Sequence, residues 1–241
     1  MSVSAFDLPQ ERVFNIDVLD LAVVPGPLAY EAGRTAAIDA HWTAENAGNP
    51  ALFDGRIILF SALSLNGRRL QGVGHEARYA TLLHWRGGSD TALAQHCFAY
   101  GVLVAGDGAL IAVRMGSHTA NPGKVYFAAG SFEMHDVVRG RIDVDLNIRR
   151  EVGEETGLDL DAADAEQGWH GWTMAGRTVV FRRYRLPEPA DRLAQRVRAV
   201  VAAQTEPEIV GPVVIRKPDD LPSETTPHMR ALVDWHFRQP G

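Results

Sequence analysis

The segment RREVGEETGL (149–158) places three glutamates at the end of a predicted helix. Glu151, Glu154 and Glu155 are spaced i, i+3 and i+4, so a helix brings their side chains to one face. Gly157 stands where a C-cap glycine ends a helix. Like charges at these spacings cost about 0.2–0.5 kcal/mol per pair, and the helix dipole adds about 0.3–1 kcal/mol for each anion. A divalent cation would offset this cost, because Mg²⁺ prefers carboxylate oxygens.

The residues before the glutamates favour a helix that packs one face against a core. Asp143 can N-cap it, and the apolar positions at i, i+4 and i+8 are Val144, Ile148 and Val152. Arg150 precedes Glu154 by four residues and can therefore hold that carboxylate in orientation. The alternative interpretation of such a pattern is a solvated acidic face with no ligand.

The same segment resembles the second half of the Nudix box, in which Arg-Glu is followed by a Glu-Glu pair and a glycine. The matching residues are Arg150, Glu151, Val152, Glu154, Glu155, Gly157 and Leu158. Upstream, GKVYFAAGSFE (123–133) is similar to the strand and glycine turn that open the box, with Gly130 as the first glycine. The resemblance covers about residues 98–216.

One part of the box departs from the family pattern. Asp136 stands where the pattern has a glutamate, and 13 residues separate it from Arg150 in place of the usual seven. The additional residues fall in VVRGRID (137–143), which we expect to be a loop insertion before the helix. Either Glu133 or Asp136 could take the place of the missing acid.

The resemblance implies an α/β fold, namely an α/β/α sandwich with a mixed sheet. It also implies a Mg²⁺-dependent diphosphatase, with Mn²⁺ as an alternative cofactor, whose metal ligands are Glu151, Glu154 and Glu155. Arg150 joins these three as an expected catalytic residue. The general base stays open, because Glu155 could assist the water and so could an acid in TEPEIVGPVV, where Glu206 and Glu208 lie.

Further residues are predicted to contact the substrate. Gly130 opens the box, and Glu208 lies where related enzymes often place another acid. Lys124 ends the loop GSHTANPGK (116–124), and Arg177 begins a strand rich in arginine. A plain connecting loop and solvated charge at a sheet edge are the alternatives for Lys124 and Arg177.

The remaining elements follow from periodicity and turn signals. The sequence predicts strands over 12–24, 169–175, 177–186 and 209–216, helices over 28–47, 189–204 and 223–238, and hairpins about 66–67 and 106–108, the first with arms 56–65 and 68–85. The stretch Arg86-Gly87-Gly88-Ser89 is the expected boundary between a smaller α+β N-terminal domain (1–88) and a Nudix-type domain (89–241).

The N-terminal part is loosely similar to the leading domain of Nudix enzymes that split UDP-glucose and UDP-galactose, chiefly through ENAGNPALFDGRIILF (45–60). The expected reaction is therefore cleavage of a UDP-sugar to UMP and a sugar 1-phosphate. The alternatives are hydrolysis of NADH, ADP-ribose or CoA, and a catalytically silent ligand sensor on the same fold.

Composition limits the partners. The net charge of −6 argues against binding to a nucleic-acid polymer. No apolar run is long enough to span a membrane, and the first residues lack the pattern of a secretory signal. The single cysteine, Cys97, suits a reducing cytosol. We therefore expect a cytoplasmic protein with a small-molecule partner, and a homodimer is one option for its assembly.

Overall fold

The computed structural model describes residues 5–88 and 90–239 of the 241. Its internal contacts divide the chain into two compact units, each built from separate segments. Unit 1 comprises Met1–Phe98, Ser131–Val144 and Gly171–Val179. Unit 2 comprises Ala99–Gly130, Asp145–His170 and Val180–Gly241. These units are defined by contacts and differ from the two sequence domains, 1–88 and 89–241, expected above. Whether each of those two domains folds by itself stays a prediction.

Unit 1 contains a mixed sheet. Its strand order is β1 (Phe6–Asp7), β4 (Arg56–Asn66), β5 (Arg69–Arg78), β3 (Val18–Val23), β10 (Arg141–Ile142) and β9 (Val137–Val138). The hairpin of β4 and β5 is confirmed, and Gly67 adopts the positive φ that its two-residue turn requires. Strand β3 runs parallel to β5. The expected strand over 12–24 is divided into β2 (Phe14–Ile16) and β3.

The helices of unit 1 include one that the sequence did not predict. The short 3₁₀ turn η1 (Ala29–Glu31) and α1 (Thr35–Gly48) occupy the expected helical region. Residues 79–85, predicted as part of a strand, instead form α2 (Tyr79–Gly87). Asp54 decides this outcome, because its Oδ1 accepts the Ala80 N–H at 2.9 Å and its Oδ2 pairs with Arg78. These contacts cap the helix from a distant segment and end β5 at residue 78.

The segment VVRGRID is a hairpin, so its assignment as a loop insertion was wrong. β9 and β10 pair across a turn at Arg139 and Gly140, both of which have positive φ. β10 then pairs with β3, and the Gly140 carbonyl accepts the Val23 N–H at 2.9 Å. Backbone hydrogen bonds to a strand more than a hundred residues earlier in the chain turn the insertion into sheet.

Unit 2 holds the elements that carry the predicted motif. Its strands are ordered β14 (Ile209–Ile215), β7 (Leu110–Met115), β6 (His96–Val104) and β13 (Arg177–Arg185), with β8 (Val125–Tyr126) beside β7 and β11 (Asp164–Ala165) beside β13. Its helices are α3 (Val144–Thr156), α4 (Ala190–Ala203) and α5 (Pro227–Arg238). Three strands, β6, β12 (Trp169–Met174) and β13, contribute residues to both units, and the first residue of α3 belongs to unit 1.

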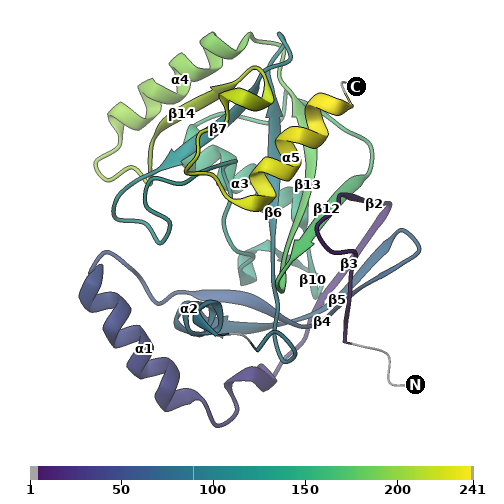
Figure 1. Cartoon of the computed structure of the whole chain (residues 1–241), viewed down its shortest axis with the longest axis vertical. Coiled ribbons are helices and arrows are strands. Elements are labelled where there is room, and N and C mark those ends of the chain that lie inside the picture. Colours follow the sequence, from purple (N-terminus) through teal and green to yellow (C-terminus); the bar gives the residue numbers. More distant parts are fainter. Residues whose placement is uncertain (1–4, 89, 240–241) are drawn as a thin grey trace. The chain divides into compact units, whose positions relative to one another are not determined.

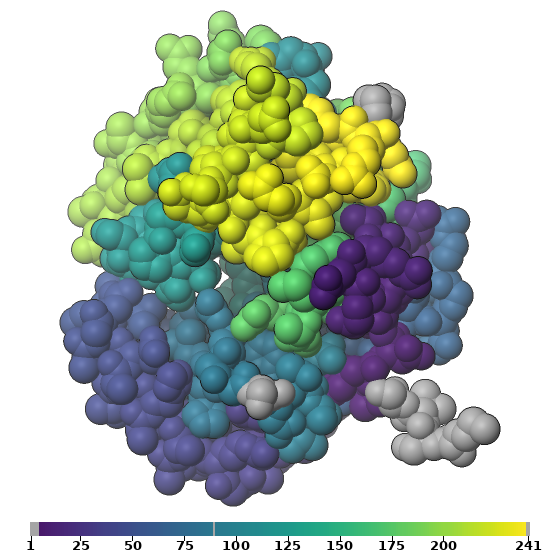
Figure 2. Space-filling model, viewed as in Figure 1, coloured from purple at the N-terminus to yellow at the C-terminus, as the bar shows by residue number. Residues whose placement is uncertain are grey.

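Most predictions for this part of the chain are confirmed: the hairpin about 106–108, β12, β13, α4, β14 and α5 all form where expected. Helix α4 packs along β14 and β7 (Figure 1). Helix α5 lies at the surface in yellow (Figure 2). The mixed α/β class is therefore confirmed. Among the described residues, no helix combines the length and the apolar character needed to cross a bilayer.

Candidate active site

Helix α3 forms as its sequence pattern predicts. It begins directly after Asp143, and its apolar stripe at 144, 148 and 152 is buried. Strand β6 receives this face, because a Cβ on Gly101 would lie 2.7 Å from Ile148. The helix ends at Gly157, whose φ is +67° and whose N–H bonds to the Gly153 carbonyl at 2.9 Å.

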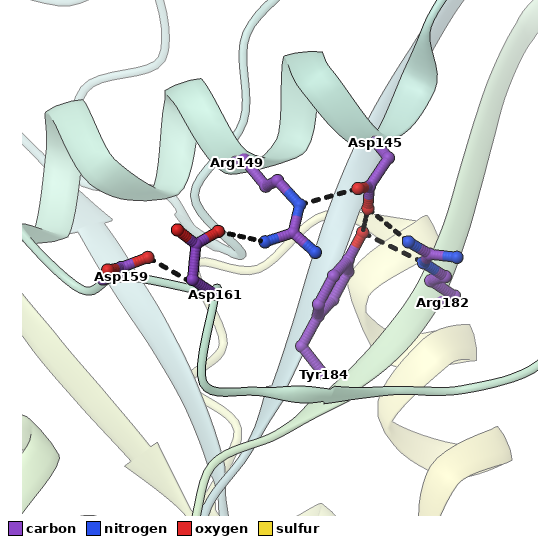
Figure 3. Close-up of polar contacts among 6 residues, drawn as sticks. All are labelled: Asp145, Arg149, Asp159, Asp161, Arg182 and Tyr184. Carbon is purple, nitrogen blue, oxygen red and sulfur yellow. Dashed lines mark hydrogen bonds and ion pairs between the residues drawn. The ribbon is translucent and has the colours of Figure 1, made fainter.

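The first turn of α3 is fixed by a polar network around Asp145 (Figure 3). Asp145 accepts a hydrogen bond from Arg149 Nε at 2.6 Å, and further ones from Arg182 and Tyr184 of β13. Arg149 also pairs with Asp161 at 3.0 Å. The helix is therefore fastened at its start to the neighbouring strand and to the segment that follows it.

Two arginines of the basic strand β13 have carboxylate partners within the chain. Arg182 neutralises Asp145 and stacks over Trp169, with the guanidinium carbon 4.2 Å from the ring centroid. Arg183 is buried and pairs with Glu166 at 3.0 Å. Both arginines are thus engaged by carboxylates of the chain. Arg177, the predicted substrate contact, belongs to unit 1.

The three motif glutamates differ in exposure. Glu151 and Glu155 are buried, whereas the side chain of Glu154 is 61% exposed. Arg150 Nη1 lies 2.8 Å from Glu151 Oε1 and 3.1 Å from Glu154 Oε2. The expected contact between Arg150 and Glu154 is confirmed, and the arginine orients a second glutamate as well.

The glycine segment lies directly against these carboxylates. A Cβ built on Gly130 would fall 2.0 Å from Glu151 Oε1, so no larger residue fits beside this rotamer. The Ala129 N–H points to Glu155 Oε1 at 3.4 Å. The two halves of the motif, separated by the hairpin of β9 and β10, therefore meet at the end of α3.

The buried carboxyl group of Glu155 is electrostatically strained. Burial raises the pKa of its carboxyl group well above the usual value, and the charges of Glu151, Glu208 and Glu154 raise it further. The bond from Ala129 opposes this shift only in part. Glu155 Oε2 is buried and has no hydrogen-bond partner among residues 5–88 and 90–239. A buried carboxylate oxygen without a hydrogen bond has a free-energy cost, which a positively charged partner would offset.

Glu208 joins the cluster through the sheet. It directly precedes β14, and its carbonyl accepts the Gly116 N–H at 2.7 Å, which fixes it beside β7. Its charge acts on Glu155 more strongly than that of Glu154 does. Of the two acids in TEPEIVGPVV, Glu208 is the one whose charge raises the pKa of Glu155.

The remaining residues predicted for the site are Lys124, Glu133 and Asp136. Lys124 is exposed at the end of its loop, beside β8. Glu133 and Asp136 belong to unit 1, where they cap the 3₁₀ turn η2 (Met134–Asp136), and the Glu133 N–H donates to Asp136 at 2.9 Å. Their expected role as the first acid of the box stays a prediction.

An aromatic group that the sequence did not single out also borders Glu155. Tyr100 is buried on β6, and its hydroxyl lies 2.8 Å from His228 Nε2 at the start of α5. Tyr126 stacks on Tyr100 with the ring centroids 6.3 Å apart. Burial raises the pKa of Tyr100 well above its usual value, and electrostatic interaction with Tyr126 and Glu155 raises it further. No local pattern marks this contact, because His228 lies 128 residues after Tyr100 in the chain.

The carboxylate side chains at the end of α3 are suitable ligands for a divalent cation. Carboxylate oxygens are the ligands that Mg²⁺ and Mn²⁺ accept, and Glu155 Oε2 needs a positive partner. Within the described part of the chain, however, no three His, Cys, Asp or Glu side chains converge closely enough to hold an ion as they stand. Glu154 is turned toward Arg150, so it must rotate before it can join Glu151 and Glu155.

The comparisons with known proteins return structures only. No protein-family model matches the chain, and no curated protein sequence matches it. A Nudix hydrolase from Nitrosomonas europaea is 19% identical, and the match covers 60% of this chain and 90% of that one with a TM-score of 0.36. A protein from Deinococcus radiodurans is 16% identical over 52% of this chain and 69% of that one, with a TM-score of 0.37.

A third similar structure is a bifunctional NMN adenylyltransferase/ADP-ribose pyrophosphatase from Francisella tularensis, complexed with AMP and a Mn ion. It is 10% identical, and the match covers 61% of this chain and 42% of that one with a TM-score of 0.37. At these identities and TM-scores a shared activity does not follow, so the site residues themselves must carry the functional assignment. The solved structures to which this chain is similar include a Nudix hydrolase, the family that residues 149–158 resemble.

Proposed function

We propose that the protein is a Nudix-type hydrolase that uses a divalent cation to cleave the diphosphate bond of a nucleoside diphosphate derivative. The observation that carries this proposal is the pair of buried glutamates at the end of α3, Glu151 and Glu155, held against Gly130. Two buried carboxylates side by side are costly without a compensating positive charge. A binding protein without metal chemistry has no need to maintain such a cluster.

Each residue of the cluster has a proposed part. Glu151, Glu154 and Glu155 would hold Mg²⁺, or Mn²⁺ in its place, with Glu208 as a further carboxylate beside them. When bound, such an ion supplies the positive charge that the diphosphate oxygens and the leaving phosphate need. Arg150 keeps Glu151 and Glu154 in orientation, and it releases Glu154 when that side chain turns to a ligand.

The reaction is a hydrolysis in which water attacks one phosphorus and the P–O–P bond breaks. A carboxylate of the chain takes the proton from the water. Glu155 and Glu208 are the two candidates for this base, because the charge of Glu208 acts on Glu155 at the end of α3. Among the described residues, Glu155 Oε2 has no hydrogen-bond partner. Single Gln variants of each, compared at saturating metal concentration, separate loss of metal binding from loss of the base.

The substrate that we favour is a UDP-hexose, which would yield UMP and a hexose 1-phosphate. Its diphosphate lies between two bulky neutral groups, so a metal cluster could act at the centre while other residues bind the ends. The loose likeness of residues 45–60 supports this choice. NADH, ADP-ribose and CoA carry the same capped diphosphate and are the alternative substrates. We place the reaction in the cytosol.

The test is a panel of these four substrate types with Mg²⁺, with Mn²⁺ and with excess EDTA, followed by phosphorus NMR. Hydrolysis in heavy-oxygen water should place the label in one of the two phosphates, which identifies the phosphorus attacked. Cleavage of another capped diphosphate in place of UDP-glucose would reject the sugar assignment and keep the reaction class. If no compound is cleaved with either metal, a ligand-binding role without catalysis replaces the enzyme.

A further inference from the structure

Arg177, the first residue of β13, is a half-buried arginine in unit 1 that has no carboxylate partner in the described part of the chain. Its guanidinium carbon lies 5.8 Å from the centroid of the Trp85 ring. Among residues 5–88 and 90–239, no hydrogen bond and no ion pair reaches this guanidinium. The group keeps its charge at all physiological pH values, so burial without a counter-ion has a free-energy cost.

Other buried or stacked arginines of the chain do have such a partner. Arg182 and Arg183, on the same strand, pair with Asp145 and Glu166. Arg34 of unit 1 stacks on Tyr30 at 4.8 Å and pairs with Asp90 at 3.2 Å. Among the residues that the structure describes, these three stacked arginines each have a carboxylate partner, whereas Arg177 has none.

A second positive charge lies close by. Arg86 follows Trp85 on α2, and burial together with the charge of Arg86 lowers the pKa of Arg177. Two guanidinium groups near one another repel, and this repulsion adds to the cost of burial. An anion from solution would relieve both effects at once.

The backbone around Arg177 is held in place by three contacts. Gly176 packs against Trp85 and Thr91 so closely that a Cβ would lie 2.9 Å from each. The Gly176 carbonyl accepts the His96 N–H at 3.0 Å. Residues 175 and 176 both have positive φ, which fixes the tight turn between β12 and β13. The backbone next to Arg177 is therefore well fixed, so that binding need not order this turn.

We propose that Arg177, beside Trp85 and within the field of the Arg86 charge, forms an anion site in unit 1 that binds a phosphate group. A guanidinium fork matches the oxygens of phosphate in two parallel hydrogen bonds, and a second positive charge nearby favours a dianion over a monoanion. This site involves none of the glutamates and does not rest on the proposed function. The phosphate belongs either to free inorganic phosphate or to a phosphate ester such as a nucleotide.

Nitrogen-edited NMR of the full chain tests the site directly. The indole N–H of Trp85 is buried and makes no hydrogen bond among the described residues, so its signal reports changes in the ring environment. Titration with inorganic phosphate at millimolar concentration should shift the Trp85 indole signal and the Arg177 Nε–H signal along one saturable curve. The affinity should fall as sodium chloride is added, because the contact is an ion pair.

Variants separate this site from general charge effects. Arg177→Gln should weaken phosphate binding by about tenfold or more, and Arg86→Gln should also weaken it. Arg177→Lys keeps the charge but loses the fork, so its loss should be smaller than that of Arg177→Gln. Arg56→Gln is the matched control. Arg56 is an exposed arginine of unit 1 on β4, and the substitution removes the same charge as Arg177→Gln.

Two results would overturn the proposal. One is a Trp85 indole signal that does not respond to phosphate in the wild-type protein, and the other is an equal response in Arg177→Gln and Arg56→Gln. Melting curves of all variants establish that each is folded before titration. Parallel titrations with UMP and with uridine identify the source of the phosphate, since an ester site binds UMP more tightly than inorganic phosphate and leaves uridine unbound.

Discussion

The carboxylate of Glu151 occupies the place where a side chain on residue 130 would begin: its Oε1 lies 2.0 Å from an ideal Cβ on Gly130. The glycine is thus required by the glutamate rather than by its own backbone, because its φ lies outside the left-handed region. The two halves of the motif depend on each other through this one contact.

The first prediction follows from that contact. Gly130→Ala should displace the Glu151 carboxylate, which sits at the flexible end of its side chain, and reduce kcat/KM by about a hundredfold while the fold persists. Gly153→Ala is the control, because among the described residues no atom outside its immediate neighbours and the backbone of α3 lies within 4 Å of its Cβ position. The control should keep its activity and melt slightly higher. Equal activity in both variants would remove Gly130 from the site.

Glu155 and Glu154 should differ when each is neutralised in the absence of divalent ions. Because the folded-state pKa of Glu155 is raised, this residue lowers the stability of the folded state progressively as the pH rises above its ordinary value of 4.5. Glu155→Gln should therefore raise Tm in EDTA, whereas Glu154→Gln should change it little, because Glu154 is exposed. Both variants should lose turnover with Mg²⁺. A lower Tm for Glu155→Gln would show that its charge is compensated within the chain.

Glu208 should matter and Glu206 should not. Glu208 acts electrostatically on Glu155, so Glu208→Gln should weaken Mg²⁺ binding or lower kcat at saturating Mg²⁺. Glu206→Gln removes the same charge from the same exposed segment two residues earlier. Calorimetry with Mg²⁺ and initial rates at several metal concentrations measure both effects. Indistinguishable results for the two variants would place Glu208 outside the site.

Removing the hairpin of β9 and β10 should affect stability more than metal binding. Replacement of residues 137–142 by a short Gly-Ser linker takes away the strand that pairs with β3 and exposes its edge. We expect a lower Tm and retained Mg²⁺ binding by the glutamates. If Mg²⁺ binding is lost in a folded variant, Asp136 or Asp143 belongs to the metal shell.

The pair of Arg183 and Glu166 should make stability depend on pH. Burial alone would raise the pKa of Glu166. Contact with His170, whose Nε2 lies 3.5 Å from Glu166 Oε2, and hydrogen bonds from Arg183 outweigh burial and lower the pKa from 4.5 to about 2. Because the folded value is the lower one, the pair stabilises the protein above pH 4.5, and this contribution is lost as the pH falls toward 2.

Glu166→Gln should accordingly reduce the free energy of unfolding by about 3 kcal/mol at pH 7, since it leaves the buried Arg183 without its partner. The difference between wild type and variant should shrink at pH 3. Urea denaturation at both pH values, monitored by tryptophan fluorescence, to which Trp235 contributes, measures this difference in the free energy of unfolding. A difference that is independent of pH would contradict the assigned pKa.

The sequence by itself determined most of the local elements, and it predicted the glutamates proposed as metal ligands. The spacing in residues 149–158 placed the glutamates on one face of α3, and the apolar stripe and Gly157 set its packing and its end. Hairpin signals and helix periodicity located β6, β7, β12, β13, α4 and α5. These features depend on neighbours within a few residues, so the chemistry of the segment itself was sufficient.

Only the tertiary structure decided which of these groups act together. Asp54 caps α2 from a distant segment, and pairing with β3 turns residues 137–142 into sheet. Burial separates Glu155 from Glu154, although the two are adjacent in the chain. Glu208 reaches Glu155 through the pairing of β14 with β7. Burial and long-range hydrogen bonds are properties of the packed chain, and no local spacing encodes them.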